Sequence, residues 1–299
     1  MNHIPPPPRS AEPTPAPPPP TSPPPPHPLA SPQPPPQPVG ATTTPPPLGP
    51  PEFVSPEHAK PSIVRNDYDH ERARWGLGDM FVSLGVFFVG SFALILLIVV
   101  FSDRDEFLQR PWLLVGVVGP HALLLAHLYW VSRTKGQGFA SDYQLRLQWS
   151  DAGLGLGLFL AGLIGAGIVA VIITQILGEP PTASAIELAQ ESGEDGLTIW
   201  LYLFAILGAT FVPVVEELIY RGLFWSALEK RGMRPWTILV ITSAVFAIIH
   251  LEPVRTAVLF VVGLAIGVGR LVTGRVGASI AAHVFVNAMA MTATLAQLA

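Results

Sequence analysis

Two adjacent glutamates and an arginine stand in one of the most apolar parts of this sequence. Glu216, Glu217 and Arg221 lie within residues 197–228, a segment long enough to cross a membrane. Charged groups at membrane depth are costly and usually functional. Glu217 and Arg221 are four residues apart, so they share a helical face and can form an ion pair. Glu216 lies about 100° away around the helix, and this carboxylate is left to act as a base or a metal ligand.

Histidines and an asparagine occupy similar apolar surroundings further along the chain. His250 ends one apolar segment, and His283 is followed one helical turn later, on the same face, by Asn287. We expect these three side chains to join the glutamates in one functional site. His121 and His127, in the second apolar segment, have no such company in the sequence, and we interpret both as structural.

Depth in the membrane supports this grouping. Counted from the basic ends of their segments, Glu216 lies 13 residues in, His250 lies 15 and His283 lies 9. At about 1.5 Å per residue these positions are roughly 20, 22 and 14 Å deep. A modest helix tilt closes this spread. We therefore predict that the three side chains converge around one water molecule or metal ion.

The chemistry that fits these residues is hydrolysis of an amide bond. A carboxylate takes a proton from water, a histidine holds that water or acts as the acid, and His283 with Asn287 can stabilise the oxyanion. Alternatively, Glu216, His250 and His283 are ligands of a divalent metal such as zinc, since catalytic zinc often takes two histidines and a carboxylate. The sequence leaves both open, because it has neither a His-Glu-x-x-His helix nor a Gly-x-Ser-x-Gly elbow.

The elements that must position these residues are membrane helices. Of the 299 residues, 49% are hydrophobic and only 13% are charged, whereas about 25% is usual for a soluble domain. We therefore predict an all-α fold, a polytopic membrane helix bundle. It has about seven transmembrane helices, at 80–101, 112–132, 152–177, 197–228, 235–251, 254–272 and 277–298.

The N-terminal part has a different composition. Of the 34 prolines, 26 lie in residues 1–56, and such a segment samples polyproline II without building a core. We predict a disordered Pro-rich cytoplasmic tail over 1–56 and a juxtamembrane segment over 57–79. The transmembrane domain then covers 80–299, with its motifs in 197–298.

Basic residues are distributed unevenly between the two sets of loops. One set holds three: Arg104, Arg110 and Arg255. The other set holds twelve: Lys60, Arg65, Arg72, Arg74, Arg133, Lys135, Arg146, Lys230, Arg231, Arg234, Arg270 and Arg275. Because basic loops stay in the cytoplasm, we predict a multi-pass protein of the plasma membrane with a cytoplasmic N-terminus. The net charge of -4 and the absence of a long basic block indicate no nucleic-acid partner.

Three motifs in the second half of the chain resemble those of a known family, the CAAX-protease and bacteriocin-processing family, which includes the type II CAAX prenyl endopeptidase. They are Glu216-Glu217-x-x-x-Arg221, Phe246-x-x-x-His250 and His283-x-x-x-Asn287. The resemblance covers about 197–298. It implies an intramembrane endopeptidase that hydrolyses peptide bonds of a membrane-associated protein or peptide.

The resemblance also implies roles for the site residues. Glu216 would be the general base that activates water, supported by Glu217 and Arg221. His250 would hold the water, and the third motif would bind the oxyanion. The family has been viewed both as metalloproteases and as glutamate-type proteases, so a metal stays open. The rival hypotheses are a non-catalytic scaffold, regulator or immunity protein of the same fold, and a transporter, although a transporter usually shows an internal repeat and none is found.

Overall fold

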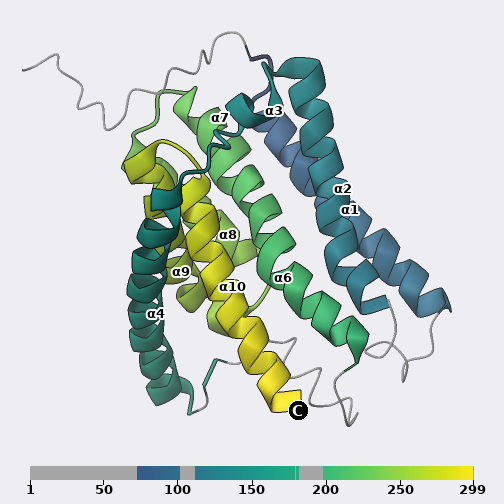
Figure 1. Cartoon of the computed structure of the whole chain (residues 1–299), viewed down its shortest axis with the longest axis vertical. Coiled ribbons are helices and arrows are strands. Elements are labelled where there is room, and N and C mark those ends of the chain that lie inside the picture. Colours follow the sequence, from purple (N-terminus) through teal and green to yellow (C-terminus); the bar gives the residue numbers. More distant parts are fainter. Residues whose placement is uncertain (1–72, 102–111, 179, 182–197, 299) are drawn as a thin grey trace, which may run out of the picture. The chain divides into compact units, whose positions relative to one another are not determined.

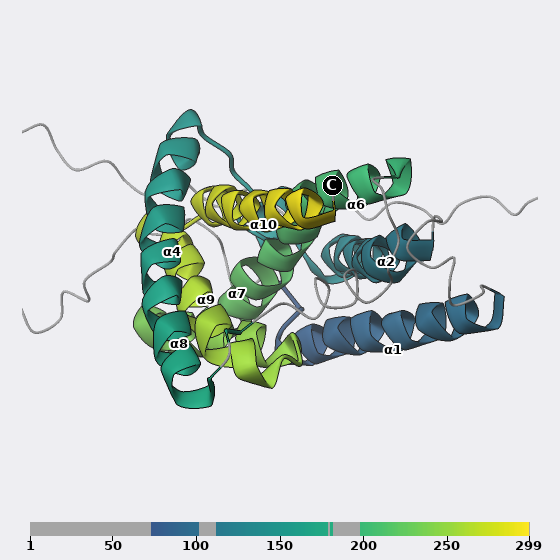
Figure 2. The same cartoon turned by 90° about the horizontal axis from the view of Figure 1, so that it is seen from below.

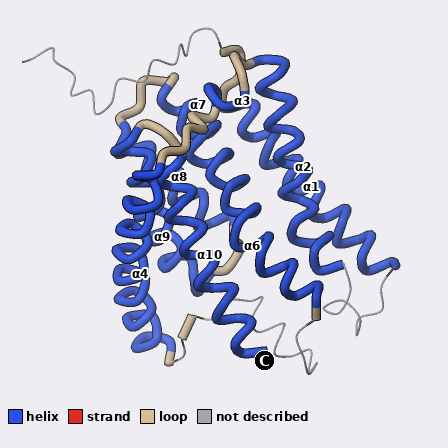
Figure 3. The backbone as a smooth tube through the Cα atoms, viewed as in Figure 1, coloured by secondary structure: helices blue, strands red, loops and turns tan. Residues whose placement is uncertain are grey.

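The computed structural model describes residues 73–101, 112–178, 180–181 and 198–298. The predicted tail over 1–56 and most of the predicted segment over 57–79 lie outside the described residues. Within the described ranges every regular element is helical and there is no strand (Figure 3). The elements are α1 (Leu77–Phe101), α2 (Trp112–Lys135), α3 (Phe139–Asp142), α4 (Trp149–Leu177), α6 (Ile199–Glu217), the π-helix η3 (Leu218–Phe224), α7 (Trp225–Glu229), α8 (Pro235–Ile249), the 3₁₀ turn η4 (Pro253–Arg255), α9 (Thr256–Thr273) and α10 (Gly277–Leu298).

Six helical stretches in the described part are long and apolar enough to cross a membrane. The longest is the continuous run Ile199–Glu229, which joins α6, η3 and α7 over 31 residues. The remaining helix, α8, has 15 residues, so its length of about 22 Å is less than the ~30 Å hydrocarbon core. The prediction of an all-α membrane bundle is confirmed: six of the seven predicted spans are long enough to cross a membrane, and the seventh is the shorter apolar helix α8.

The central helices of the bundle are α6 and α10. Helix α10 packs against α6, α4 and α9, while α6 also packs against α2, which pairs with α1. Helices α8 and α9 contact each other, and α9 also contacts α4. Figure 2 shows α1 and α2 on one side of α6 and α10, and α4, α8 and α9 on the other. Side chains on α6 and α10 therefore meet side chains from both sides.

Small residues let these helices approach closely. A Cβ atom at Gly155 of α4 would lie 2.5 Å from the Cβ of Ala281 on α10, and one at Gly165 would lie 2.8 Å from Val261 on α9. Glycine at such contacts is typical of membrane helix packing, where dispersion contacts replace the hydrophobic effect. The glycines of α4 therefore bring α9 and α10 to their observed distances from this helix.

The loops predicted to be cytoplasmic gather at one end of the bundle. The backbone N–H of Arg74 donates to the carbonyl of Lys135 at 2.8 Å, and the Lys230 ammonium donates to the carbonyl of Ala73 at 2.5 Å. Figure 1 shows α3 and α7 at this end and the C-terminus of α10 at the opposite end. The grouping agrees with the charge pattern, and the assignment of this end to the cytoplasm stays a prediction.

A carboxylate at the start of α4 holds the beginning of α10 in place. Asp151 accepts a hydrogen bond from the backbone N–H of Gln148 at 2.8 Å, which caps the helix. It also accepts from Arg275 at 2.7 Å. Position 277 is glycine because a Cβ there would lie 2.1 Å from the Asp151 carboxylate. This contact fixes the start of the helix that carries His283.

The segment between α2 and α4 packs against the π-helix. Tyr143 is fully buried, and its hydroxyl donates to the carbonyl of Leu128 at 2.6 Å. Burial raises the pKa of the Tyr143 hydroxyl, so it keeps its proton and remains a donor. A Cβ at Gly222 would lie 3.0 Å from the Cβ of Tyr143. The close contact at this glycine positions the helical turn that follows the two glutamates.

Candidate active site

The two glutamates occupy the last two positions of α6, directly before the helix widens. The π-helix η3 begins at the next residue and contains Arg221. Such turns are rare and often occur at functional sites. Arg221 donates from Nη1 to Oε1 of Glu217 at 2.8 Å, and both side chains are 0% exposed. Arg221 also donates from Nη2 to the carbonyl of Gly263 on α9 at 2.6 Å, so the pair ties α6 and η3 to α9.

Phe246 is the first residue of the Phe246-x-x-x-His250 motif, and its ring contacts several of the site residues. The Arg221 guanidinium carbon lies 5.3 Å from the ring centroid, a cation–π distance. The rings of His250 and His283 pack edge-on against it, with centroids 4.6 and 5.5 Å away. Phe246 is itself buried. It therefore packs against Arg221 and both histidines and restricts the orientation of the two imidazole rings.

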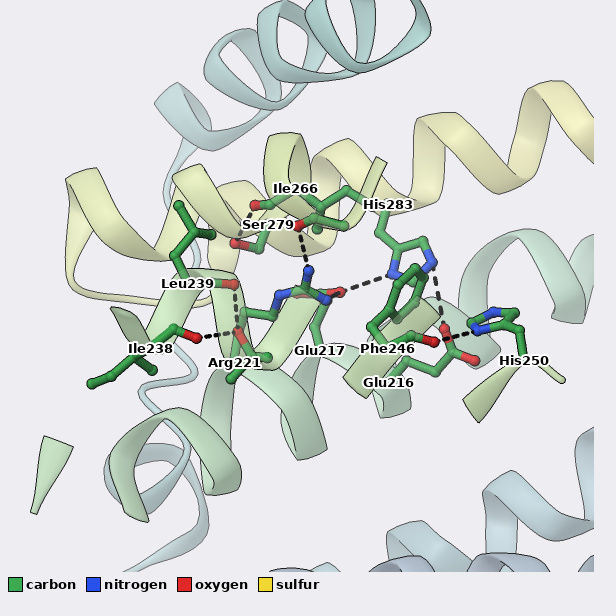
Figure 4. Close-up of polar contacts among 12 residues, drawn as sticks. Glu216, Glu217, Arg221, Ile238, Leu239, Phe246, His250, Ile266, Ser279 and His283 are labelled. Atoms are coloured by element: carbon green, nitrogen blue, oxygen red, sulfur yellow. Dashed lines mark hydrogen bonds and ion pairs between the residues drawn. The ribbon is translucent and has the colours of Figure 1, made fainter. Parts of the chain in front are cut away.

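His283 links the two glutamates. Its Nδ1 lies 2.8 Å from Oε1 of Glu217, and its Nε2 lies 3.4 Å from Oε2 of Glu216 (Figure 4). Because the ionised Glu217 can only accept a hydrogen bond, Nδ1 of His283 carries the proton. In the neutral ring, Nε2 is then an unprotonated nitrogen that faces Glu216.

His250 presents its ring in the same manner. Its Nδ1 donates to the carbonyl of Phe246 at 2.6 Å, so its Nε2 is the free nitrogen of the neutral ring. His250 interacts electrostatically with Glu216, and Figure 4 draws both among the same group of side chains. The Glu216 side chain is 15% exposed, whereas Glu217 is 0% exposed. The two carboxylates therefore differ in access: Glu217 is an internal counter-ion, and Glu216 is reachable.

His121 is a site residue that the sequence did not reveal. Its Nε2 lies 3.4 Å from Oε1 of Glu216, and the residue is only 7% exposed. The expectation that His121 lacks polar company is therefore wrong, whereas its interpretation as a structural residue is not tested by this contact. One signal was present: His121 lies 14 residues before Lys135, hence about 21 Å deep, at the same level as Glu216. His127, by contrast, lies beside the ring of Trp130 at 5.6 Å.

Asn287 lies between α10 and α6. Its amide donates to the carbonyl of Gly208 on α6 at 3.0 Å. It is one helical turn beyond His283, as its spacing predicts, and its side chain is half-buried. Its role as an oxyanion donor stays a prediction.

The predicted metal ligation is left open by the positions of these side chains. Among the described residues, no group of three or more His, Asp or Glu side chains is placed to hold a metal ion. Nε2 of His121 and Nε2 of His283 approach different oxygens of Glu216, each at 3.4 Å. Ligation by Glu216, His250 and His283 therefore stays a prediction, and no step below runs through a metal.

Fold and site together define a class: a multi-pass membrane protein whose central helices carry a buried glutamate–arginine pair beside an accessible, histidine-flanked glutamate. A family model described as Rce1-like, "Type II CAAX prenyl endopeptidase Rce1-like", matches residues 198–289. These residues include all three motifs, so the resemblance of this segment to the CAAX-protease family is confirmed. No curated protein and no solved structure matches the chain significantly.

Proposed function

We propose that this protein is an intramembrane endopeptidase that cleaves a peptide bond of a membrane-associated protein or peptide. The observation that carries the proposal is that the two adjacent carboxylates differ in burial and in their partners. Glu217 is fully buried and bound to Arg221 and His283, whereas Glu216 is partly exposed and faces imidazole nitrogens. A structural ion pair needs only the first carboxylate. The second has the access and the partners that a general base requires.

In the proposed reaction Glu216 takes a proton from a water molecule, while Nε2 of His250 accepts the second hydrogen bond and orients that water. The hydroxide attacks the peptide carbonyl, and the resulting oxyanion accepts a hydrogen bond from Asn287. Glu216 then returns its proton to the leaving nitrogen as the C–N bond breaks, which gives a carboxylic acid and an amine. The acid proton passes to the amine, so the final products are a carboxylate and an ammonium group. Binding of substrate at membrane depth excludes bulk water and strengthens each of these interactions.

The tautomer of His283 limits its part in this reaction. Because Nδ1 donates to Glu217, a neutral ring has no second N–H to offer to an oxyanion. Only a ring that is protonated on both nitrogens can donate from Nε2. His283 therefore assists the oxyanion as a cation, whereas Asn287 donates without a change of charge.

The proposal is tested with purified full-length protein in nanodiscs and internally quenched peptides. The peptides include a farnesylated one ending in a CAAX sequence, because the matching family is described as a CAAX prenyl endopeptidase. Glu216→Gln keeps the shape of the side chain and removes the base, so turnover is expected to fall by at least about 10³-fold. Asp79→Asn, the same acid-to-amide change at an ion pair with the exposed Lys135 at the end of the bundle, is the matched control and should keep activity.

The same assay separates the remaining alternatives. Loss of activity with a chelator, restored by added zinc, would support the metal prediction; insensitivity would support a glutamate-type protease. Unchanged biological function in cells that express only Glu216→Gln would overturn the protease proposal and favour a scaffold or immunity protein. We place the protein in the plasma membrane with its site open towards the cytoplasm, in line with the basic loops.

A further inference from the structure

We propose that His121 is a positioning residue of the catalytic site, which holds the Glu216 carboxylate in the orientation needed for proton transfer. This inference rests on the proposed function. His121 is on α2, outside the family-matched segment 198–289. No motif of that segment therefore accounts for it, and the assignment depends on the geometry around Glu216.

The His121 ring is held rigidly. Its Nδ1 donates to the carbonyl of Val117, one turn earlier on the same helix, at 2.7 Å. The ring of Phe87 on α1 packs edge-on against it, with centroids 5.0 Å apart. The side chain is almost completely buried. With one nitrogen bound to its own helix and one face covered, the ring has a single direction left for its other nitrogen, and that direction is Glu216.

The Glu216 carboxylate is held between two rings, one for each oxygen. Oε1 faces Nε2 of His121 and Oε2 faces Nε2 of His283, both at 3.4 Å. The two histidines come from α2 and α10, and both of these helices pack against α6. A carboxylate contacted at both oxygens from different helices cannot rotate freely. Such fixation is what a general base needs, because small errors in its position lower the rate strongly.

The contact is suited to orientation rather than to strong binding. A nitrogen–oxygen distance of 3.4 Å is longer than an ordinary hydrogen bond of about 2.9 Å. In addition, the neutral His121 ring offers an unprotonated Nε2, because its Nδ1 proton is donated to Val117. An unprotonated nitrogen and a carboxylate oxygen are both acceptors, so this contact becomes a hydrogen bond only when a further proton lies on the ring or on the carboxyl group. Without that proton the buried ring restricts the carboxylate by packing alone. The loss of His121 therefore affects the placement of Glu216 more than the stability of the fold.

A purely structural role makes a different prediction. A histidine that only fills space between α2 and α6 can be replaced by an apolar residue of similar volume with little effect on turnover. Such a change could lower the unfolding temperature without affecting the catalytic rate. The distinction between the two roles therefore lies in kcat, in KM and in rescue by a polar replacement.

The experiment compares His121→Leu, His121→Gln and His127→Leu in nanodiscs with the farnesylated CAAX peptide. We expect His121→Leu to lower kcat by about 10–100-fold with KM unchanged within about twofold. His121→Gln, whose amide can reach the position of Nε2, should recover most of this loss. His127→Leu is the matched control, the same change six residues further along α2, and should retain wild-type kinetics.

Three results would overturn the inference: a wild-type kcat in His121→Leu, an effect confined to KM, or no rescue by His121→Gln. A failure of the proposed function gives a different result: the wild-type protein cleaves no peptide, or Glu216→Gln cleaves as fast as the wild type. In that event thermal unfolding still tests the contact. The effects of His121→Leu and Glu216→Gln on the unfolding temperature should deviate from additivity by about 2–4 °C, and strict additivity would refute the contact.

Discussion

Glu217→Gln is the substitution whose consequence follows most directly from the structure. Glu217 accepts hydrogen bonds from Arg221 and His283 through the same oxygen, Oε1. An amide oxygen can still accept these bonds, so shape and hydrogen bonding largely survive. What disappears is the negative charge beside a guanidinium that is 0% exposed.

The magnitude is set by the unpaired cation. Breaking a buried ion pair by removing one partner costs about 3–5 kcal/mol, because the other charge is left without compensation. The Gly263 carbonyl and the Phe246 ring remain in contact with Arg221, but neither supplies the missing negative charge. At roughly 2–4 °C per kcal/mol for a chain of this size, the unfolding temperature should fall by about 6–20 °C.

Thermal unfolding in detergent, followed by the intrinsic fluorescence of the tryptophans, measures this shift. Glu216→Gln is the matched control: it makes the same chemical change one residue earlier, at a partly exposed side chain without an arginine partner, and should lower the unfolding temperature much less. The double variant Glu217→Gln/Arg221→Met removes both charges and should regain much of the lost stability. Wild-type stability in Glu217→Gln, or no recovery in the double variant, would refute the reasoning.

Three further predictions concern turnover, the tail and topology. Asn287→Ala should lower kcat by about 10²-fold if its amide binds the oxyanion, and a peptide-cleavage assay that finds an unchanged kcat would exclude that role. Deletion of 1–56 should leave cleavage of the native substrate intact, because a proline-rich tail builds no core; lost activity in a stably inserted protein would contradict this. Reporter fusions should place Ala299 outside the cell and the loop 230–234 in the cytoplasm, and a cytoplasmic signal at Ala299 would contradict the odd number of spans.

Helical periodicity alone was sufficient to predict part of this site from the sequence. Glu217 and Arg221 pair because four residues of helix place both side chains on one face, whatever surrounds them. In the same way, depth counted along each segment indicated that Glu216 and His283 lie at similar levels, and their side chains are 3.4 Å apart. The membrane class followed from composition alone, since long apolar segments leave the backbone no alternative to helices.

Contacts between helices needed the tertiary structure. The sequence cannot show that His121, 95 residues before Glu216, faces one oxygen of that carboxylate, because the rotation of α2 about its axis is set by its packing against α1 and α6. For the same reason it left open which glutamate binds Nδ1 of His283, and therefore which ring nitrogen is free for chemistry. Spacing along one helix relates only the residues of that helix. The site is formed by side chains from four helical segments, whose rotation and depth are decided by close contacts at residues such as Gly155 and by the bond between Asp151 and Arg275.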